Sequence, residues 1–87
     1  MNKVEIDECL QYYATLLNKN GGTIYVNEGE LTKFEIGRGK QYTRASVENC
    51  GIVIEYGGTF GSYRTVTKQY IPYHSIVRVV SSITTEV

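Results

Sequence analysis

The stretch "LLNKNGGTIYVNEGELTKFEI", residues 16–36, contains the point at which the hydrophobic pattern of this chain changes. Before the glycine pair at 21–22, apolar side chains recur every three or four residues, which is typical of a helix with one buried face. After the pair, short runs of β-branched and aromatic residues are separated by glycine-containing turns, which is typical of strands. Glycine tolerates the left-handed backbone at which many helices end. The stretch therefore predicts a helix before residue 21 and strands after residue 22.

The predicted helix covers residues 4–18, "VEIDECLQYYATLLN". Asp7 and Glu8 near its start and Lys19 at its end complement the helix dipole. One apolar stripe runs along it, made of Ile6, Cys9, Leu10, Tyr13, Leu16 and Leu17. We expect this stripe to pack on the core.

The predicted strands are short and rich in β-branched and aromatic residues. They cover residues 23–27, 31–36, 42–49, 51–56 and 64–71, and a last strand covers 75–82. The segment "GGTFGS" at 57–62 is expected to be a loop. Pro72 lacks an N–H group and should end the fifth strand.

The length of 87 residues fits one small domain, residues 1–87. The predicted class is α+β, mainly β, with an N-terminal helix followed by five or six antiparallel strands. An open flat sheet of this size would expose its edges and leave its apolar face poorly covered. We therefore expect a strongly bent small β-barrel capped by the helix.

The segment "HSIVRVV", His74–Val80, resembles the last strand–turn–strand segment of the Sm-like small β-barrel family, to which the bacterial Hfq RNA chaperones belong. In both, a histidine on a turn is followed two residues later by isoleucine and then by paired valines. The order of the elements is also similar. The resemblance implies an Sm-like or SH3-like barrel that binds RNA without catalysis and assembles as a homo-oligomer.

The resemblance also implies positions for the binding residues. In Sm-like rings the turn before the last strand lines a pocket in which an aromatic ring stacks on a base. Tyr73 and His74 occupy that turn here, with Arg78 and Lys68 as expected phosphate partners. A turn histidine with only a structural role is the alternative.

Two further segments could contact nucleic acid. "GRGKQYTR", residues 37–44, places Arg38, Lys40 and Arg44 around a tyrosine, a pattern found on single-stranded nucleic-acid surfaces. "EYGGTFGSYR", residues 55–64, combines glycines with Arg64, and its backbone N–H groups could approach a phosphate. For the second segment, a flexible hairpin between strands is the favoured alternative.

Catalysis is not expected from this composition. The chain has one histidine, two cysteines at positions 9 and 50, and dispersed carboxylates, so no nucleophile has an evident base beside it. The cysteine spacing does not fit a zinc site, and we expect two free thiols. No catalytic residue, metal or cofactor is predicted.

The net charge is zero, but its distribution is uneven. Residues 1–37 contain 3 lysines and 6 carboxylates, whereas residues 38–87 contain 6 basic and 3 acidic residues. Such a distribution can direct an acidic ligand to one part of the surface, or it can reflect scatter. The apolar runs are too short for a membrane helix and no signal peptide is recognised, so a soluble cytoplasmic protein is expected.

Two classes of function follow. The leading interpretation is a nucleic-acid-binding homo-oligomer, with RNA favoured over DNA. The alternative is a protein- or small-ligand-binding accessory or inhibitor module, of the kind that phages and other mobile elements carry. The eight tyrosines are expected to be mainly half-buried strand residues, and Tyr25, Tyr56 and Tyr63 are the candidates for partner contact.

Overall fold

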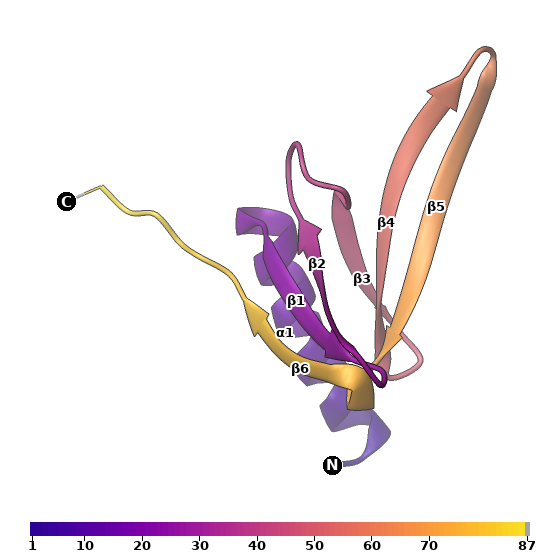
Figure 1. Cartoon of the computed structure of the whole chain (residues 1–87). Coiled ribbons are helices and arrows are strands. Elements are labelled where there is room, and N and C mark those ends of the chain that lie inside the picture. Colours follow the sequence, from indigo (N-terminus) through magenta and orange to yellow (C-terminus); the bar gives the residue numbers. More distant parts are fainter. Residues whose placement is uncertain (87) are drawn as a thin grey trace.

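The computed structural model describes residues 1–86, which form one N-terminal helix, six strands and a short 3₁₀ turn (Figure 1). All pairings between the strands are antiparallel. The elements are α1 (Lys3–Asn20), β1 (Gly22–Asn27), β2 (Leu31–Ile36), β3 (Arg44–Glu48), β4 (Gly51–Phe60), β5 (Tyr63–Pro72), η1 (Tyr73–Ser75) and β6 (Ile76–Val80). The predicted α+β class and the order of its elements are confirmed.

The strands form two sheets rather than the closed barrel expected from the sequence. One sheet has the order β2-β1-β6 and the other β3-β4-β5. Within residues 1–86 no ladder joins the two sheets, and an isolated parallel bridge pairs Ile36, the last residue of β2, with Tyr42 in the connection to β3. The chain turns at 37–43, between β2 and β3, so the second sheet starts in a new direction and no ladder closes a ring.

Tyr42 fills the seam between the two sheets. Its ring meets Phe34 of the first sheet and Tyr56 of the second edge-on, with centroids 5.8 Å and 5.4 Å apart. Its hydroxyl donates a hydrogen bond of 2.8 Å to Gln69 Oε1 on β5. The sheets therefore share one core although they are hydrogen-bonded separately. Helix α1 contributes Leu10, Ala14 and Leu17 to that core.

The helix starts and ends at residues suited to both positions. Asn2 Oδ1 accepts the N–H of Glu5 at 2.9 Å, and the Glu5 carboxylate accepts the N–H of Asn2, which makes a capping box. At the other end Gly21 has φ 74° and its N–H bonds to Leu17 O at 2.8 Å. The left-handed exit expected at the glycine pair is confirmed.

Asn18 fastens the helix to the edge of the second sheet. Its Nδ2 donates to Ala45 O at 2.7 Å, and its Oδ1 accepts the Ala45 N–H at 2.8 Å. The side-chain amide thus replaces a neighbouring strand for one residue of β3 and satisfies both of its backbone groups.

Asn18→Asp is expected to lower the free energy of unfolding by about 2 kcal/mol, because a carboxylate oxygen would face the Ala45 carbonyl with no proton between them. Urea unfolding followed by circular dichroism measures the loss. The control is Asn27→Asp, the same change at an exposed position at the end of β1. Equal losses in the two variants would contradict the role of Asn18.

The β4–β5 hairpin is longer than predicted. The expected loop at 57–62 is instead strand up to Phe60 and again from Tyr63, which leaves Gly61 and Ser62 as the turn. The glycines at 57 and 58 keep a φ outside the left-handed region, so they continue the strand. The outer part of the hairpin, residues 56–67, projects from the body and is called the arm below (Figure 1). The glycine-rich loop considered for phosphate binding is therefore a two-stranded ribbon.

Strand β5 ends at Pro72, as predicted, and the 3₁₀ turn η1 leads into β6. Strand β6 returns to pair with β1. Val26 pairs with Ile76 and Tyr25 pairs with Arg78, so Val77 has no partner in this ladder and forms a β-bulge.

Candidate functional site

Three of the predicted binding residues line one hollow. Tyr73 and His74 come from η1 and Arg78 from β6, around a volume of about 300 Å³. Helix α1 lines the hollow opposite the turn. This hollow is called the turn hollow below. Its other lining residues are Cys9, Tyr13, Ile76, Val77 and Val79.

The turn itself is held by backbone hydrogen bonds. The Tyr73 N–H donates to Cys50 O at 2.9 Å, and the Ile76 N–H bonds back to Tyr73 O. The Tyr73 side chain packs against the core, whereas His74 is exposed. Backbone hydrogen bonds thus hold the turn in place, and the exposed His74 imidazole is free to interact with solvent or a ligand.

Arg78 carries the only formal charge in the described lining of the turn hollow. Its guanidinium lies over the ring of Tyr25, with Cζ 4.6 Å from the centroid, because the two residues are cross-strand partners. This cation–π contact holds the guanidinium against the sheet. The lining therefore combines two phenol rings and one imidazole with Arg78, whose guanidinium lies over Tyr25 outside the hollow.

Tyr13 contributes a hydroxyl that stays protonated. The neighbouring Cys9 thiol and, to a smaller extent, burial raise the pKa of Tyr13 above its ordinary value of 10.0. At neutral pH this hydroxyl can donate a hydrogen bond into the turn hollow.

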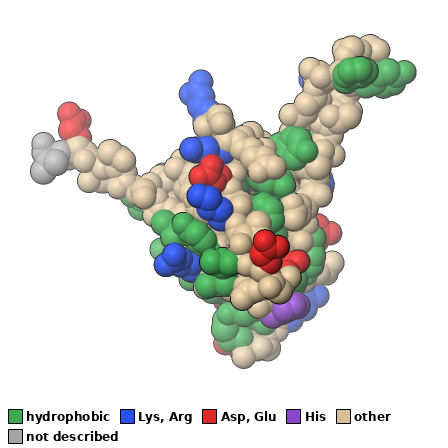
Figure 2. All heavy atoms as spheres, in the orientation of Figure 1, with side chains coloured by type: hydrophobic (Ala, Val, Ile, Leu, Met, Phe, Trp, Pro, Cys, Tyr) green, Lys and Arg blue, Asp and Glu red, His purple; other side chains and the backbone are tan. Residues whose placement is uncertain are grey.

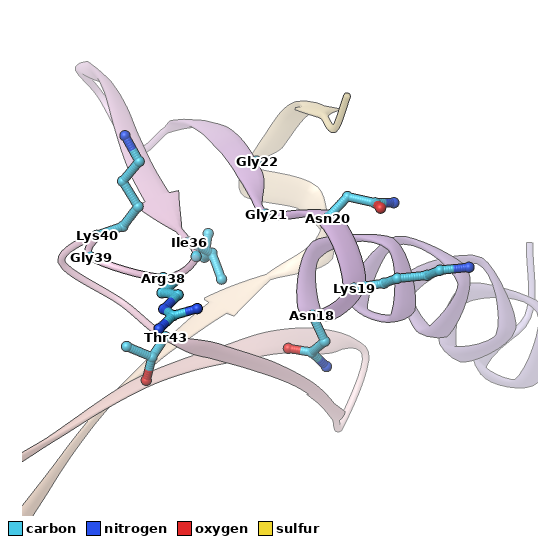
Figure 3. A pocket seen from close by; sticks show the side chains of 11 residues that line it. Asn18, Lys19, Asn20, Gly21, Gly22, Ile36, Arg38, Gly39, Lys40 and Thr43 are labelled. Carbon is cyan, nitrogen blue, oxygen red and sulfur yellow. The ribbon is translucent and has the colours of Figure 1, made fainter. Parts of the chain in front are cut away.

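Arg38 and Lys40 lie at a second, larger hollow of about 630 Å³, between the β2–β3 connection and the C-terminal end of α1. The helix contributes Lys19, a third cation, to its lining. Figure 3 shows that the three cationic side chains point in different directions instead of converging on one point. The arrangement suits contacts with an extended anion better than the capture of a small one.

The remaining predicted residues lie elsewhere. Arg44 and Lys68 both contact Glu55, with N–O distances of 3.8 Å and 3.9 Å, so one carboxylate offsets part of their charge. Arg64 lies on the arm beside the glycines at 57 and 58. The structure therefore brings together three of the eight predicted residues at the turn hollow, two at the larger hollow and two at Glu55, and it leaves Arg64 apart.

The helical part of the turn hollow was missed by the sequence interpretation. Cys9 and Tyr13 were assigned to the buried stripe of α1, and both are partly exposed. Their spacing of four residues places them on one helix face, but it does not show which strand that face meets. The position of β6 supplies that information.

Within residues 1–86 both cysteines are free, and no three His, Cys, Asp or Glu side chains gather in a group that could hold a metal ion. No described helix combines the length and the apolar character needed to cross a membrane.

Comparisons of the chain with protein-family models, with curated proteins and with solved structures give no match.

Proposed function

We propose that this chain is a non-enzymatic protein that binds single-stranded nucleic acid, RNA in preference to DNA, at the turn hollow, and that it acts as an oligomer. The observation that carries the proposal is the meeting of Tyr73, His74 and Arg78 at one hollow. A tyrosine ring offers a stacking face for a base, a neutral imidazole donates or accepts a hydrogen bond, and a guanidinium binds phosphate.

The arrangement of the strands supports an Sm-like or SH3-like architecture. If β2 and β3 are counted as one strand bent at 37–43, the chain has five strands, of which the first pairs with the last. A 3₁₀ turn precedes that last strand. In small barrels of these two types the first strand also pairs with the last, and a 3₁₀ turn also precedes the last strand. A bend in the second strand divides such a barrel into two sheets.

The free edges of the sheets support self-association. Strand β5 pairs only with β4, and β6 pairs only with β1, among the described residues. Unpaired strand edges present N–H and C=O groups that a neighbouring copy can bind. An oligomer formed in this way would bring several turn hollows to one nucleic acid.

The expected binding depends on stacking more than on charge. Arg78 is the one cation in the described lining, and each phosphate contact with a single strand contributes a slope of about −0.7 to log K against log salt. We therefore expect a slope of about −0.7 per hollow, which is shallow for a nucleic-acid-binding protein.

Tyr73→Leu is expected to weaken RNA binding by about 5- to 150-fold, because loss of one base stack costs about 1–3 kcal/mol. Leucine retains apolar packing against the core, so the urea midpoint should change little. His74→Ala, at an exposed position, should weaken binding by a smaller factor. Fluorescence anisotropy with labelled 12-nucleotide RNA and DNA at 50 mM and 200 mM salt measures both effects.

Arg64→Ala is the matched control, since Arg64 lies on the arm and not at the turn hollow. Arg64→Ala should reduce RNA affinity no more than about twofold, a decrease that includes the weaker non-specific attraction between the protein and phosphate. An absence of binding by the unaltered chain at 50 mM salt would refute the proposal, and so would equal losses in Arg64→Ala and Tyr73→Leu.

A second candidate, a protein-binding accessory or inhibitor module, is favoured by the exposed aromatic residues of the arm. Phe60 is 82% exposed and Tyr63 is 73% exposed. Exposed apolar groups of this size mark many protein-interaction surfaces. Failure to bind nucleic acid at low salt would favour this second candidate.

A further inference from the structure

The arm has one aromatic and uncharged face. Paired residues of antiparallel strands lie on the same face, and the pairs alternate from one face to the other. The pairs Ile52–Ile71 and Ile54–Gln69 start on the core side. The same face then continues beyond the body as the pairs Tyr56–Thr67, Gly58–Thr65 and Phe60–Tyr63. These last three pairs are called the inner face of the arm.

The other face of the ribbon carries the charges. It contains the pairs Glu55–Lys68, Gly57–Val66 and Thr59–Arg64. The two cations of the hairpin are therefore on the side opposite to the aromatic residues. A nucleic-acid strand on the inner face would meet no cation of this ribbon.

The inner face exposes an apolar patch, although Tyr56, next to the body, is already in edge contact with the Tyr42 ring. Tyr56 is 36% exposed, and Phe60 and Tyr63 are far more exposed. Figure 2 shows apolar side chains at the far end of the projecting hairpin. Since an aromatic side chain offers 150–250 Å² for burial, these three rings expose roughly 400 Å² of apolar surface. A two-stranded ribbon is also marginally stable without packing on at least one face.

Gly58 has no role inside the chain that requires glycine. Its φ lies outside the left-handed region, and an added Cβ would meet only Thr65 Oγ1 at 3.4 Å, an ordinary contact. Glycine in a strand costs about 0.5–1 kcal/mol relative to alanine, and it often marks a place where another chain approaches closely. The bare backbone at Gly58 therefore leaves a recess on the inner face that a side chain of another molecule could fill, and Gly57 leaves similar room on the opposite face.

The inner face is complementary to itself. The bulky pair Phe60–Tyr63 lies next to the nearly bare pair Gly58–Thr65, two residues or about 7 Å along the ribbon. If two arms pack face to face and antiparallel, with a two-fold axis between these pairs, Phe60 of each copy lies over Gly58 of the other. This is an isologous contact, in which each copy supplies both the protrusion and the recess.

The area allows at most a weak or moderate dimer. With the threonine rows included, complete burial of both inner faces would cover about 1,200 Å² in total, the lower limit of standard-sized specific interfaces, and partial burial would cover less. The absence of charge on both faces removes the repulsion that like-charged surfaces of two identical copies would have.

We propose that the arm is a dimerisation surface and that its partner is the arm of a second copy of this chain, packed by the inner faces. The inference deepens the self-association in the proposed function by naming a surface for it, and it does not rest on RNA binding.

The experiment is sedimentation equilibrium of the full chain between about 1 and 500 μM. The unaltered chain should dimerise within this range, and Gly58→Val should weaken the dimer at least thirtyfold because the side chain fills the recess. Phe60→Ser should do the same by removing the protrusion. Urea unfolding at low concentration should show that Gly58→Val is folded, since the monomer has room for the added Cβ.

Val66→Ser is the matched control, because Val66 is exposed on the opposite face of the same ribbon. It should change the dimerisation constant less than threefold. The inference is overturned if the chain stays monomeric at 500 μM, if Gly58→Val leaves the assembly intact, or if Val66→Ser weakens it equally. If the chain forms an oligomer that Gly58→Val does not weaken, the arm is not the interface and pairing of strand edges explains the oligomer. If the arm dimer forms but the chain does not bind RNA, only the proposed function is refuted.

Discussion

Gly22→Ala is expected to lower the free energy of unfolding by about 3 kcal/mol, since overpacking of this kind costs roughly 1–3 kcal/mol and backbone atoms cannot rotate away. Gly22 is the first residue of β1, where the chain leaves the helix and passes beside the end of β6. A Cβ there would fall against the carbonyl oxygen of Val80 and lie 2.9 Å from Leu17 Cδ2. It would also lie 3.1 Å from Ser81 Cα. Relief requires β1 and β6 to separate.

The junction offers little freedom for such a movement. Ser81 Oγ donates to Gly21 O at 2.7 Å, which fixes the end of β6 to the helix exit. Gly29→Ala is the control, because Gly29 has φ 87° but no atom near an added Cβ. It should cost about 1 kcal/mol from backbone strain alone. Equal losses in both variants, measured by urea unfolding, would show that close approach at Gly22 is not the cause.

Ile54→Ala is expected to lower the free energy of unfolding by about 3–4 kcal/mol, in the range for large-to-small changes at fully buried sites. Ile54 has no exposed surface and lies on β4, the central strand of the second sheet, between Ala45 and Gln69. Its loss would leave a cavity where helix and sheet meet. The fixed strands on both sides limit how far the site can collapse.

Val66→Ala on the same hairpin is the control for Ile54→Ala. Val66 is 61% exposed and lies outside the core, so its truncation should cost less than about 0.5 kcal/mol. Urea denaturation of both variants under the same conditions gives the comparison. Similar losses would indicate that Val66 is packed as closely as Ile54, contrary to its exposure in the structure.

The elements of this fold could be predicted because they depend on local patterns. The apolar stripe at helical spacing, the glycine pair at the exit and Pro72 at the end of β5 each act on neighbouring residues. Local patterns could not predict whether the barrel closes, because closure depends on pairing between strands distant in sequence. The arm was missed because Gly57 and Gly58 are read locally as a turn, while their strand conformation depends on partners at 65 and 66.

The candidate site shows the same division. Tyr73, His74 and Arg78 are near one another in sequence, on a turn and the strand that follows, so their meeting was predictable. The sequence predicts Lys68 as a phosphate partner and Arg44 as part of a nucleic-acid surface, because the strand register is not visible in it. The register places both opposite Glu55. Cys9 and Tyr13 reach the hollow through the docking of the helix, which no local pattern specifies.

The pairing of β6 with β1 has a consequence for biosynthesis. A ribosome adds about 5–20 residues per second, so the roughly fifty residues between these strands take several seconds to emerge. During that interval β1 has β2 on one side and an open edge on the other. The nascent chain therefore carries an unprotected strand until its own tail is translated, and this is the period in which chaperones or premature association would act on it.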